Sequence, residues 1–213
     1  MGTVRATAED RNFYLKTVMS YRKVTAARLS EMTGISKRSL ERYMSGRTDI
    51  AEAAGLTVAK ISYVLSADAY VLGGVSPVRM DALKMPAGEQ QAAAVYEEPY
   101  SRYDVSEAFR WAMGYRQYNA VKLSTETGIN TRTIHAIAKD RTDARIIKAS
   151  TVFPLCRRLV FHPDFLYGLR RMDQYEAYLR EYRTRQEEMR QARQVIAEAK
   201  KILKERKSNE RNV

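Results

Sequence analysis

The chain has 213 residues, 45% of them hydrophobic and 29% charged, with 37 Lys and Arg against 25 Asp and Glu. This hydrophobic content is sufficient for packed cores and excludes a wholly disordered chain. The formal net charge of +12 favours a polyanionic partner, nucleic acid before an anionic membrane surface.

Cysteine usage and the apolar runs indicate a cytoplasmic protein. The single Cys156 excludes an internal disulfide and fits a reducing compartment, and we expect it to be a small core residue. No apolar run approaches the ~18 residues that a membrane-spanning helix needs. The N-terminal stretch MGTVRATAED lacks the apolar core of a signal peptide. We therefore expect no membrane partner.

From the N-terminus onward, apolar residues recur at helical rather than strand-like spacing. Thr7, followed three residues later by Asp10, predicts a capping box at the start of a first helix. Thr25 predicts the cap of a second helix. That helix is expected to end at Gly34, because glycine suits the left-handed position after a helix.

Three further helices are predicted before residue 75. Ser36 is the expected cap of the third helix, which should end at Gly46. A fourth helix is predicted over residues 56–65, and a short fifth one around 70–72. The sequence therefore predicts a small domain of about five helices.

The same pattern occurs a second time, displaced by 94 positions. The stretch at 18–36, VMSYRKVTAARLSEMTGIS, matches the stretch at 112–130, AMGYRQYNAVKLSTETGIN, without a gap. Nine residues are identical: Met19, Tyr21, Arg22, Ala26, Leu29, Ser30, Thr33, Gly34 and Ile35 recur as Met113, Tyr115, Arg116, Ala120, Leu123, Ser124, Thr127, Gly128 and Ile129. A long period with two occurrences predicts tandem domains rather than a solenoid.

These matches define four predicted regions. Copy one covers residues 1–75 and copy two covers 101–168, and Trp111 of copy two is expected in the core. Between them, 76–100 holds three of the five prolines and is predicted to be a linker with a short helix near 80–84. Residues 169–213 contain no Pro or Gly and predict one long amphipathic helix, frayed at its end.

The long helix carries apolar residues close to a heptad spacing, interrupted by Gln186 and Arg193. This spacing favours either a coiled-coil homodimer or packing back across the two copies. For a dimer, the candidate contact residues are Met172, Tyr175, Leu179, Tyr182, Met189, Ile196 and Leu203.

The order helix, TGIS turn, helix resembles the helix-turn-helix of the Cro and phage-repressor (XRE-type) family. In copy one the resemblance is carried by Ala26, Leu29, Gly34, Ile35, Ser36, Leu40 and Gly46, and in copy two by Ala120, Leu123, Gly128, Ile129, Asn130 and Ile134. It implies an all-α fold: two tandem lambda-repressor-like helix-turn-helix domains, about five helices each, plus the long C-terminal helix. In that family the third helix enters the major groove.

Candidate DNA contacts follow from the resemblance. Outward positions of the third helices are assigned to base reading: Lys37, Arg38, Ser39, Glu41, Arg42, Thr131, Arg132, Thr133 and His135. Arginine can bond twice to guanine, and a carboxylate can accept from cytosine. Residues near helix ends are assigned to phosphate: Thr25, Ser45, Arg47, Asn119, Lys139 and Arg141. Alternatively, these faces are merely solvated, and Asp49 and Asp143 cap the segments that follow them.

Charge, repeat and resemblance together predict a sequence-specific double-stranded DNA-binding transcriptional regulator, of the phage or mobile-element repressor type, associated with the nucleoid. Two unequal copies would act as a covalent pseudo-dimer on an asymmetric site, with half-sites ~34–36 Å apart. The alternative is a protein-interaction or antitoxin-like module in which only copy one binds DNA and the C-terminal helix binds a partner. No catalytic constellation, metal site or cofactor motif is apparent. His162 is expected to cap the short fifth helix of copy two.

Overall fold

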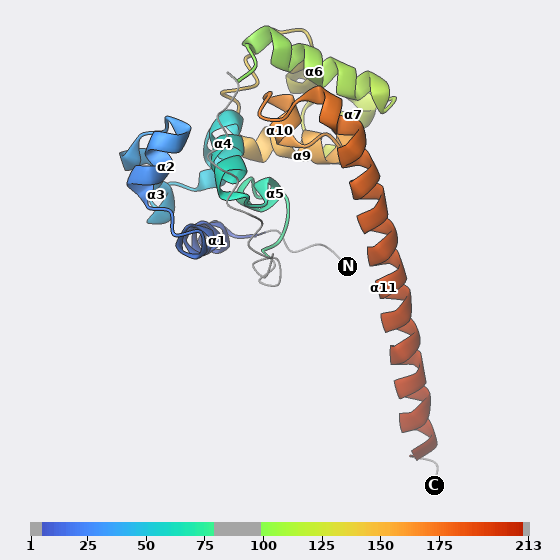
Figure 1. The fold of residues 1–213 in the computed structure, drawn as a ribbon. Coiled ribbons are helices and arrows are strands. Elements are labelled where there is room, and N and C mark those ends of the chain that lie inside the picture. Colours follow the sequence, from blue (N-terminus) through green and yellow to red (C-terminus); the bar gives the residue numbers. More distant parts are fainter. Residues whose placement is uncertain (1–5, 79–98, 211–213) are drawn as a thin grey trace. The chain divides into compact units, whose positions relative to one another are not determined.

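The structure, a computed structural model, describes residues 6–78 and 99–210. It comprises two compact units, Met1–Arg171 and Met172–Val213 (Figure 1). The described residues form helices and turns, with one isolated backbone bridge and no strand, so the predicted all-α class is confirmed. Most of the predicted linker, including its short helix near 80–84, lies outside the described residues.

Each helix of copy one has a counterpart with the same bounds in copy two, displaced by 94 positions. Copy one contains α1 (Ala8–Tyr21), α2 (Ala26–Thr33), α3 (Lys37–Met44), the 3-10 turn η1 (Ile50–Glu52), α4 (Gly55–Leu65) and α5 (Ala69–Leu72). Copy two contains α6 (Arg102–Tyr115), α7 (Ala120–Thr127), α8 (Thr131–Ala138), α9 (Ala149–Leu159) and α10 (Pro163–Leu166).

The predicted capping residues start the helices. The Thr7 hydroxyl accepts from the Asp10 backbone N–H, and the Asp10 carboxylate accepts from the Thr7 backbone N–H, which completes the capping box. Thr25 and Ser36 cap α2 and α3, and His162 caps α10. Side-chain acceptors of this kind satisfy N–H groups that have no partner within the helix, so these helix starts are set by local sequence.

Backbone conformation repeats as faithfully as the helices do. Among the described residues, every backbone angle φ in the left-handed region belongs to a pair separated by 94 positions. The pairs are Lys23 and Gln117, Gly34 and Gly128, Gly46 and Asp140, Ser66 and Val160, and Gly74 and Gly168. Left-handed φ is rare outside glycine, so its recurrence at non-glycine residues shows that both copies follow one chain path.

Each copy has an apolar core, but the expectation for Trp111 is wrong. The buried face of α6 contains Val105, Phe109 and Ala112. Trp111 lies outside that face, and 41% of its surface is exposed. Its ring stacks on Tyr115 with centroids 5.0 Å apart. The exposure of Trp111 is therefore set by its position on α6 and not by the usual tendency of tryptophan to be buried. Cys156 is buried on α9 as expected, and burial raises the pKa of its thiol.

The two copies pack against each other through α4 and α9 and the residues that precede them. The Gly55 backbone N–H donates to the Ile147 carbonyl at 2.7 Å, and the Ala149 N–H donates to the Ala53 carbonyl at 2.8 Å. The two bonds are equivalent, because Gly55 of copy one corresponds to Ala149 of copy two and Ala53 corresponds to Ile147. Such a reciprocal contact is the mark of an isologous, twofold interface. Copies one and two are therefore related by an approximate twofold axis at the antiparallel bridge between Ala54 and Lys148.

The second unit consists of the 3-10 turn η3 (Met172–Gln174) and the long helix α11 (Tyr175–Glu210). The predicted long helix thus begins a few residues later than expected. Tyr175 and Leu179 are buried, whereas Ile196 is 55% exposed. The side chains of the other predicted dimer residues Tyr182, Met189 and Leu203 lie outside the described residues, and Met172 is half-buried. Homodimerisation stays a prediction. No helix of the described chain is long and apolar enough to cross a membrane.

Candidate nucleic-acid interface

The corner between α2 and α3 is built by the same contacts as the corner between α7 and α8. In copy one the Thr33 hydroxyl donates to the Leu29 carbonyl at 2.7 Å, and the Ile35 N–H donates to the Thr33 hydroxyl at 3.3 Å. In copy two the equivalent bonds of Thr127 have the same lengths. Both corners are therefore fixed by a threonine, with a left-handed glycine between the helices.

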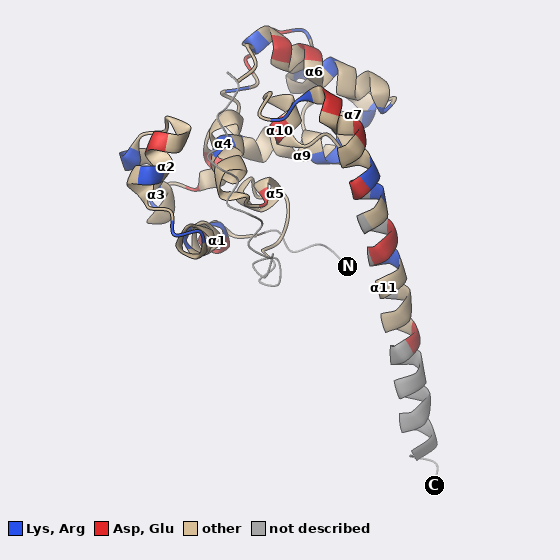
Figure 2. Ribbon diagram, viewed as in Figure 1, with Lys and Arg blue, Asp and Glu red and all other residues tan. Residues whose placement is uncertain are grey.

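The buried side of α3 is narrow, so most of this helix is available to a partner. Leu40 is fully buried, whereas Lys37, Arg38, Glu41 and Arg42 are exposed. Ser39 is half-buried and its hydroxyl lies 2.8 Å from the Ser36 hydroxyl, so the Ser39 side chain faces the cap rather than solvent. Figure 2 shows the basic residues in this α2–α3 region with a few acidic ones beside them.

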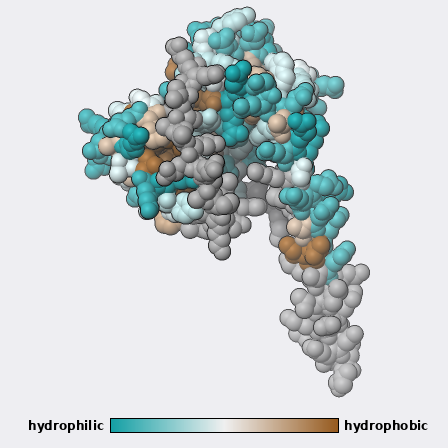
Figure 3. All heavy atoms as spheres, viewed as in Figure 1, coloured by the Kyte–Doolittle hydropathy of each residue, from teal (hydrophilic) through white to brown (hydrophobic). Residues whose placement is uncertain are grey.

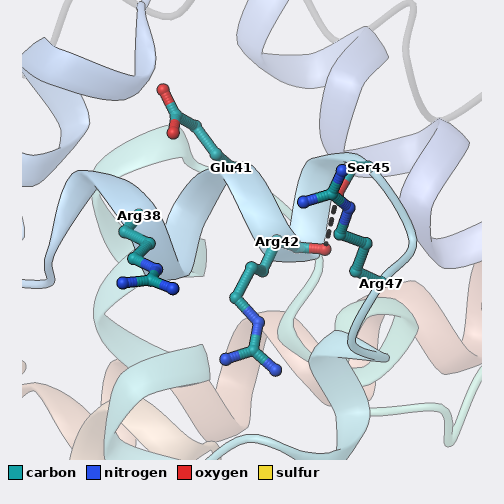
Figure 4. A pocket seen from close by; sticks show the side chains of 5 residues that line it. All are labelled: Arg38, Glu41, Arg42, Ser45 and Arg47. Carbon is teal, nitrogen blue, oxygen red and sulfur yellow. Dashed lines mark hydrogen bonds between the residues drawn. The ribbon is translucent and has the colours of Figure 1, made fainter.

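Three arginines line an open depression of about 520 Å³ beside α3, together with Glu41 and Ser45. Arg38 and Arg42 extend to the same side of the helix, Glu41 extends to the opposite side, and Arg47 comes from the following loop (Figure 4). Within the described part of the chain, none of the three guanidinium groups forms an ion pair. Unneutralised guanidinium groups that line one depression suit a phosphate or a guanine edge.

Copy two presents a different set of side chains on the same frame. Arg132, His135, Lys139 and Arg141 are exposed, whereas Thr131 and Thr133 are half-buried. Arg132 takes the place of Arg38, but His135 replaces Glu41, Ala136 replaces Arg42 and Lys139 replaces Ser45. The face of copy one has four cations and one carboxylate, namely Lys37, Arg38, Arg42, Arg47 and Glu41. The face of copy two has three cations, namely Arg132, Lys139 and Arg141. Both faces therefore have a formal charge of +3 when His135 is neutral. The two faces therefore differ in pattern and not in net charge.

The predicted phosphate residues at the starts of α2 and α7 are exposed and already serve as caps. Thr25 accepts from the Arg28 N–H at 3.2 Å, and Asn119 accepts from the Lys122 N–H at 2.8 Å. Capping uses the side-chain oxygen as an acceptor. The Thr25 hydroxyl hydrogen and the Asn119 amide N–H groups are chemically available as donors, which is what a phosphate oxygen needs.

In each of the repeated RTD triplets, the aspartate forms structural hydrogen bonds and the arginine is exposed. Asp49 accepts from the Ala51 N–H at 3.0 Å, and Asp143 accepts from the Arg145 N–H at 2.9 Å, so the predicted capping by both aspartates is confirmed. Phosphate contact by Arg47 and Arg141 stays a prediction. Each aspartate also holds an arginine. Arg11 on α1 donates to Asp49 from Nε at 2.9 Å, and Arg145 donates to Asp143 at 3.0 Å. Arg47 lies two residues before Asp49 and Arg141 two residues before Asp143, and both arginines are exposed.

These ion pairs place the loop after each third helix, and neither of them was predicted from the sequence. Arg11 is only 8% exposed and lies on the buried face of α1. Burial raises the pKa of Asp49, but bonds from Arg11 and from the Ala51 N–H outweigh it and leave the pKa below 3.8. In copy two, mainly the Arg145 hydrogen bond lowers the pKa of Asp143. A charged residue at an apolar helix position was the available signal.

The replacement of Gly46 by Asp140 is compensated by two other differences between the copies. A Cβ on Gly46 would lie 2.8 Å from the Asn12 amide nitrogen. Copy two has the smaller Ser106 in place of Asn12, and Ser106 lies 3.3 Å from the Asp140 carboxylate. Arg102 also donates to that carboxylate, at 2.7 Å. The left-handed turn at the end of the third helix is thus kept without glycine.

Comparison with known proteins adds no family assignment, because no protein-family model, curated protein or solved structure matches the chain.

Proposed function

We propose that the chain is a sequence-specific double-stranded DNA-binding protein that regulates transcription, in the manner of a phage or mobile-element repressor. Its α3 and α8 would enter the major groove, as in the Cro and phage-repressor helix-turn-helix family that the sequence resembles. The observation that carries the proposal is the set of exposed arginines without ion-pair partners around α3, on a corner that copy two repeats bond for bond.

Base reading is assigned first to Arg38 and Arg132, the one cation that the third helices share. A guanidinium can donate two parallel bonds to guanine, and such a contact discriminates by ~1–3 kcal/mol. Arg42 and His135 would give each copy its own preference. Arg47, Arg141, Thr25 and Asn119 would bond to phosphates, which fix register and not sequence.

The approximate twofold axis supports action as a covalent pseudo-dimer. In repressor dimers, twofold symmetry of the protein is matched by half-sites in inverted orientation about one helical turn apart. Here one chain supplies both members of the pair. Because the outward residues differ between copies, the two half-sites should be unequal.

The experiment is selection of bound sequences from a random duplex pool, followed by affinity measurements on the selected site. Arg38→Ala and Arg132→Ala should each weaken binding to that site about 5- to 150-fold, the range set by ~1–3 kcal/mol. Lys16→Ala serves as a charge control, because it removes an exposed cation from α1. Recovery of no preferred sequence, or equal losses in all three variants, would refute sequence-specific reading.

A second candidate is an interaction module in which only copy one binds DNA and α11 binds a protein partner. It is favoured by Val195 and Ile196 of α11, whose side chains are 64% and 55% exposed. Figure 3 shows an apolar spot on this helix. Arg132→Ala separates the two candidates. It weakens DNA binding if both copies read DNA, and it leaves binding unchanged if copy two does not.

A further inference from the structure

Large and small side chains occupy complementary places on the surface between the copies. A Cβ built on Gly55 would lie 2.1 Å from the hydroxyl oxygen of Tyr167, and one built on Gly73 would lie 2.3 Å from the Phe153 ring. Both glycines belong to copy one and both rings to copy two. The rings thus rest directly on the backbone of copy one, where no side chain of copy one intervenes.

The twofold relation shows what two second copies would meet if they paired in the same way. The 94-residue displacement maps Gly55 onto Ala149, and it maps Gly73 onto Tyr167. Tyr167 would then lie against the Cβ of Ala149, closer than real Cβ contacts allow. Phe153 would meet the Tyr167 side chain in the space that a glycine now leaves open. Overpacking of this kind is destabilising, so copy two cannot pair with itself in this geometry.

Two first copies would fail for the opposite reason. The displacement places Gly73 of one copy where Tyr167 now lies on Gly55. It also places Ala59 where Phe153 now lies on Gly73. Both aromatic rings of the present interface, Tyr167 and Phe153, would be lost, and nothing would fill the space that they occupy. Cavities in a packed interface cost free energy in proportion to their volume, so this pair is weak.

Charges at the rim select the same pairing. Lys148 Nζ of copy two lies 2.6 Å from the Glu52 carboxylate of copy one, and the Ser150 hydroxyl donates to that carboxylate at 3.1 Å. The displacement maps Glu52 onto Ile146 and Lys148 onto Ala54. A like pair would leave each charge opposite an apolar residue. Exposed ion pairs add little affinity, but a charge that loses its counterpart discriminates between partners.

We propose that this surface is a selective pairing site whose partner is the unlike copy. Copy one binds copy two and rejects a second copy one, and copy two likewise rejects another copy two. The covalent connection is therefore not required to hold the pair together. The proposal is independent of DNA binding, because none of its residues belongs to the α3 or α8 face.

The first test cuts the folded full-length chain at a protease site inserted after Gly88. Mass spectrometry of the intact complexes should show the N- and C-terminal pieces together in a 1:1 ratio at micromolar concentration. After mixing with an isotope-labelled cut sample, exchange should produce only complexes with equal numbers of the two pieces. Free pieces at that concentration would overturn the proposal, as would a complex of two N-terminal or two C-terminal pieces alone.

The second test uses the closest contact. Gly55→Ala should raise the dissociation constant of the cut pieces at least tenfold, because its Cβ meets the Tyr167 hydroxyl. Tyr167→Phe in the same chain removes that hydroxyl and should recover much of the loss. Gly114→Ala is the matched control, since no atom lies within 4 Å of its added Cβ. An unchanged dissociation constant in Gly55→Ala would overturn the steric argument.

Charge reversal provides a test that does not depend on the tolerance of the packed interface. Glu52 and Lys148 are exposed enough for substitution, with 46% and 61% of their side chains accessible. Pieces carrying Glu52→Lys should prefer partner pieces carrying Lys148→Glu over unaltered ones when both are offered in equal amounts. Incorporation of the two partner pieces in equal proportion would overturn the role of the charges in selection.

Discussion

At the residue scale, a single glycine adopts the left-handed backbone angle in each of the two corners. Gly34 has a φ of 69° and Gly128 one of 74°, and no atom lies within 4 Å of a Cβ added to either. Glycine is therefore needed for the backbone angle and not for space. Residues with a Cβ reach this region at a free-energy cost.

We predict that Gly34→Ala lowers the free energy of unfolding by about 1 kcal/mol, because alanine is strained at positive φ. Gly114→Ala is the matched comparison. Gly114 lies within α6 at ordinary helical φ with equal space around it, so the same change should stabilise the chain by about 0.5–1 kcal/mol. Urea unfolding followed by circular dichroism measures both. Equal effects of the two substitutions would contradict this account of the corner.

Asp49 makes the stability of copy one depend on pH. Its pKa is lowered below 3.8 in the folded chain, against an unfolded value of 3.8. A lowered folded pKa adds stability that is present above pH 3.8 and is lost as the pH falls through the folded value. The free energy of unfolding should therefore decrease as the pH falls below about 4.

We predict that Asp49→Asn reduces this acid-dependent loss. It also lowers stability at neutral pH, because Arg11 is then buried without its counter-charge. Urea unfolding at a series of pH values between 7 and 3 measures both effects. Identical slopes for the substituted and unaltered chains below pH 4 would show that Asp49 is not the responsible group.

At the scale of elements, the third helices combine one common frame with two different outward faces. The caps, the buried residues and the threonine bonds of α3 and α8 correspond position by position. Their outward residues at 41 and 42 of copy one, Glu and Arg, are His135 and Ala136 in copy two. Outward residues do not stabilise the helix core, so they can differ without altering the fold.

We predict that Glu41→His combined with Arg42→Ala makes the selected DNA site more symmetrical, if the proposed reading of DNA by both copies is right. The change gives both helices the same pair of residues at these positions. Selection from a random duplex pool, run beside the unaltered chain and Lys16→Ala, measures the symmetry of the two halves. A site unaltered from that of the parent chain would assign base reading to other residues.

At the scale of the whole molecule, copy one pairs with copy two within the unit Met1–Arg171. Tandem duplication by itself is compatible with half-sites in direct or inverted order. The reciprocal bonds of Gly55 and Ala149 relate the copies by an approximate twofold axis, and such an axis reverses the direction of α8 relative to α3.

We therefore predict that the proposed DNA site is an imperfect inverted repeat with one preferred spacing. Insertion of five base pairs between its halves rotates one half by about half a turn, so affinity should fall to that of a single half-site. Titration of labelled duplexes measures this, with the two halves in direct order as the comparison. Equal affinity for inverted and direct order would mean that the copies separate on DNA.

Local chemistry made much of this protein predictable from sequence. Caps such as Thr7 and Ser36, the left-handed Gly34 and the all-α class depend on neighbours within a few residues in the chain. The repeat gave a second, independent copy of each signal. The predicted fourth helix, 56–65, differs from α4 by one residue at its start. Sequence also identified four exposed residues of α3, namely Lys37, Arg38, Glu41 and Arg42, because helical spacing separates them from Leu40. It did not show that Ser39 faces the Ser36 cap, which is a contact between side chains.

Contacts between distant residues were decided only by the tertiary structure. The Arg11–Asp49 ion pair joins residues 38 positions apart, and the placing of Trp111 depended on which face of α6 is covered. The pairing of the copies depends on Tyr167 fitting over Gly55, between surfaces that no local pattern connects. Sequence by itself determined the helices and caps within each copy, since these signals depend on residues close together in the chain. Only the fold decided how the copies meet, since shape complementarity arises after both surfaces exist.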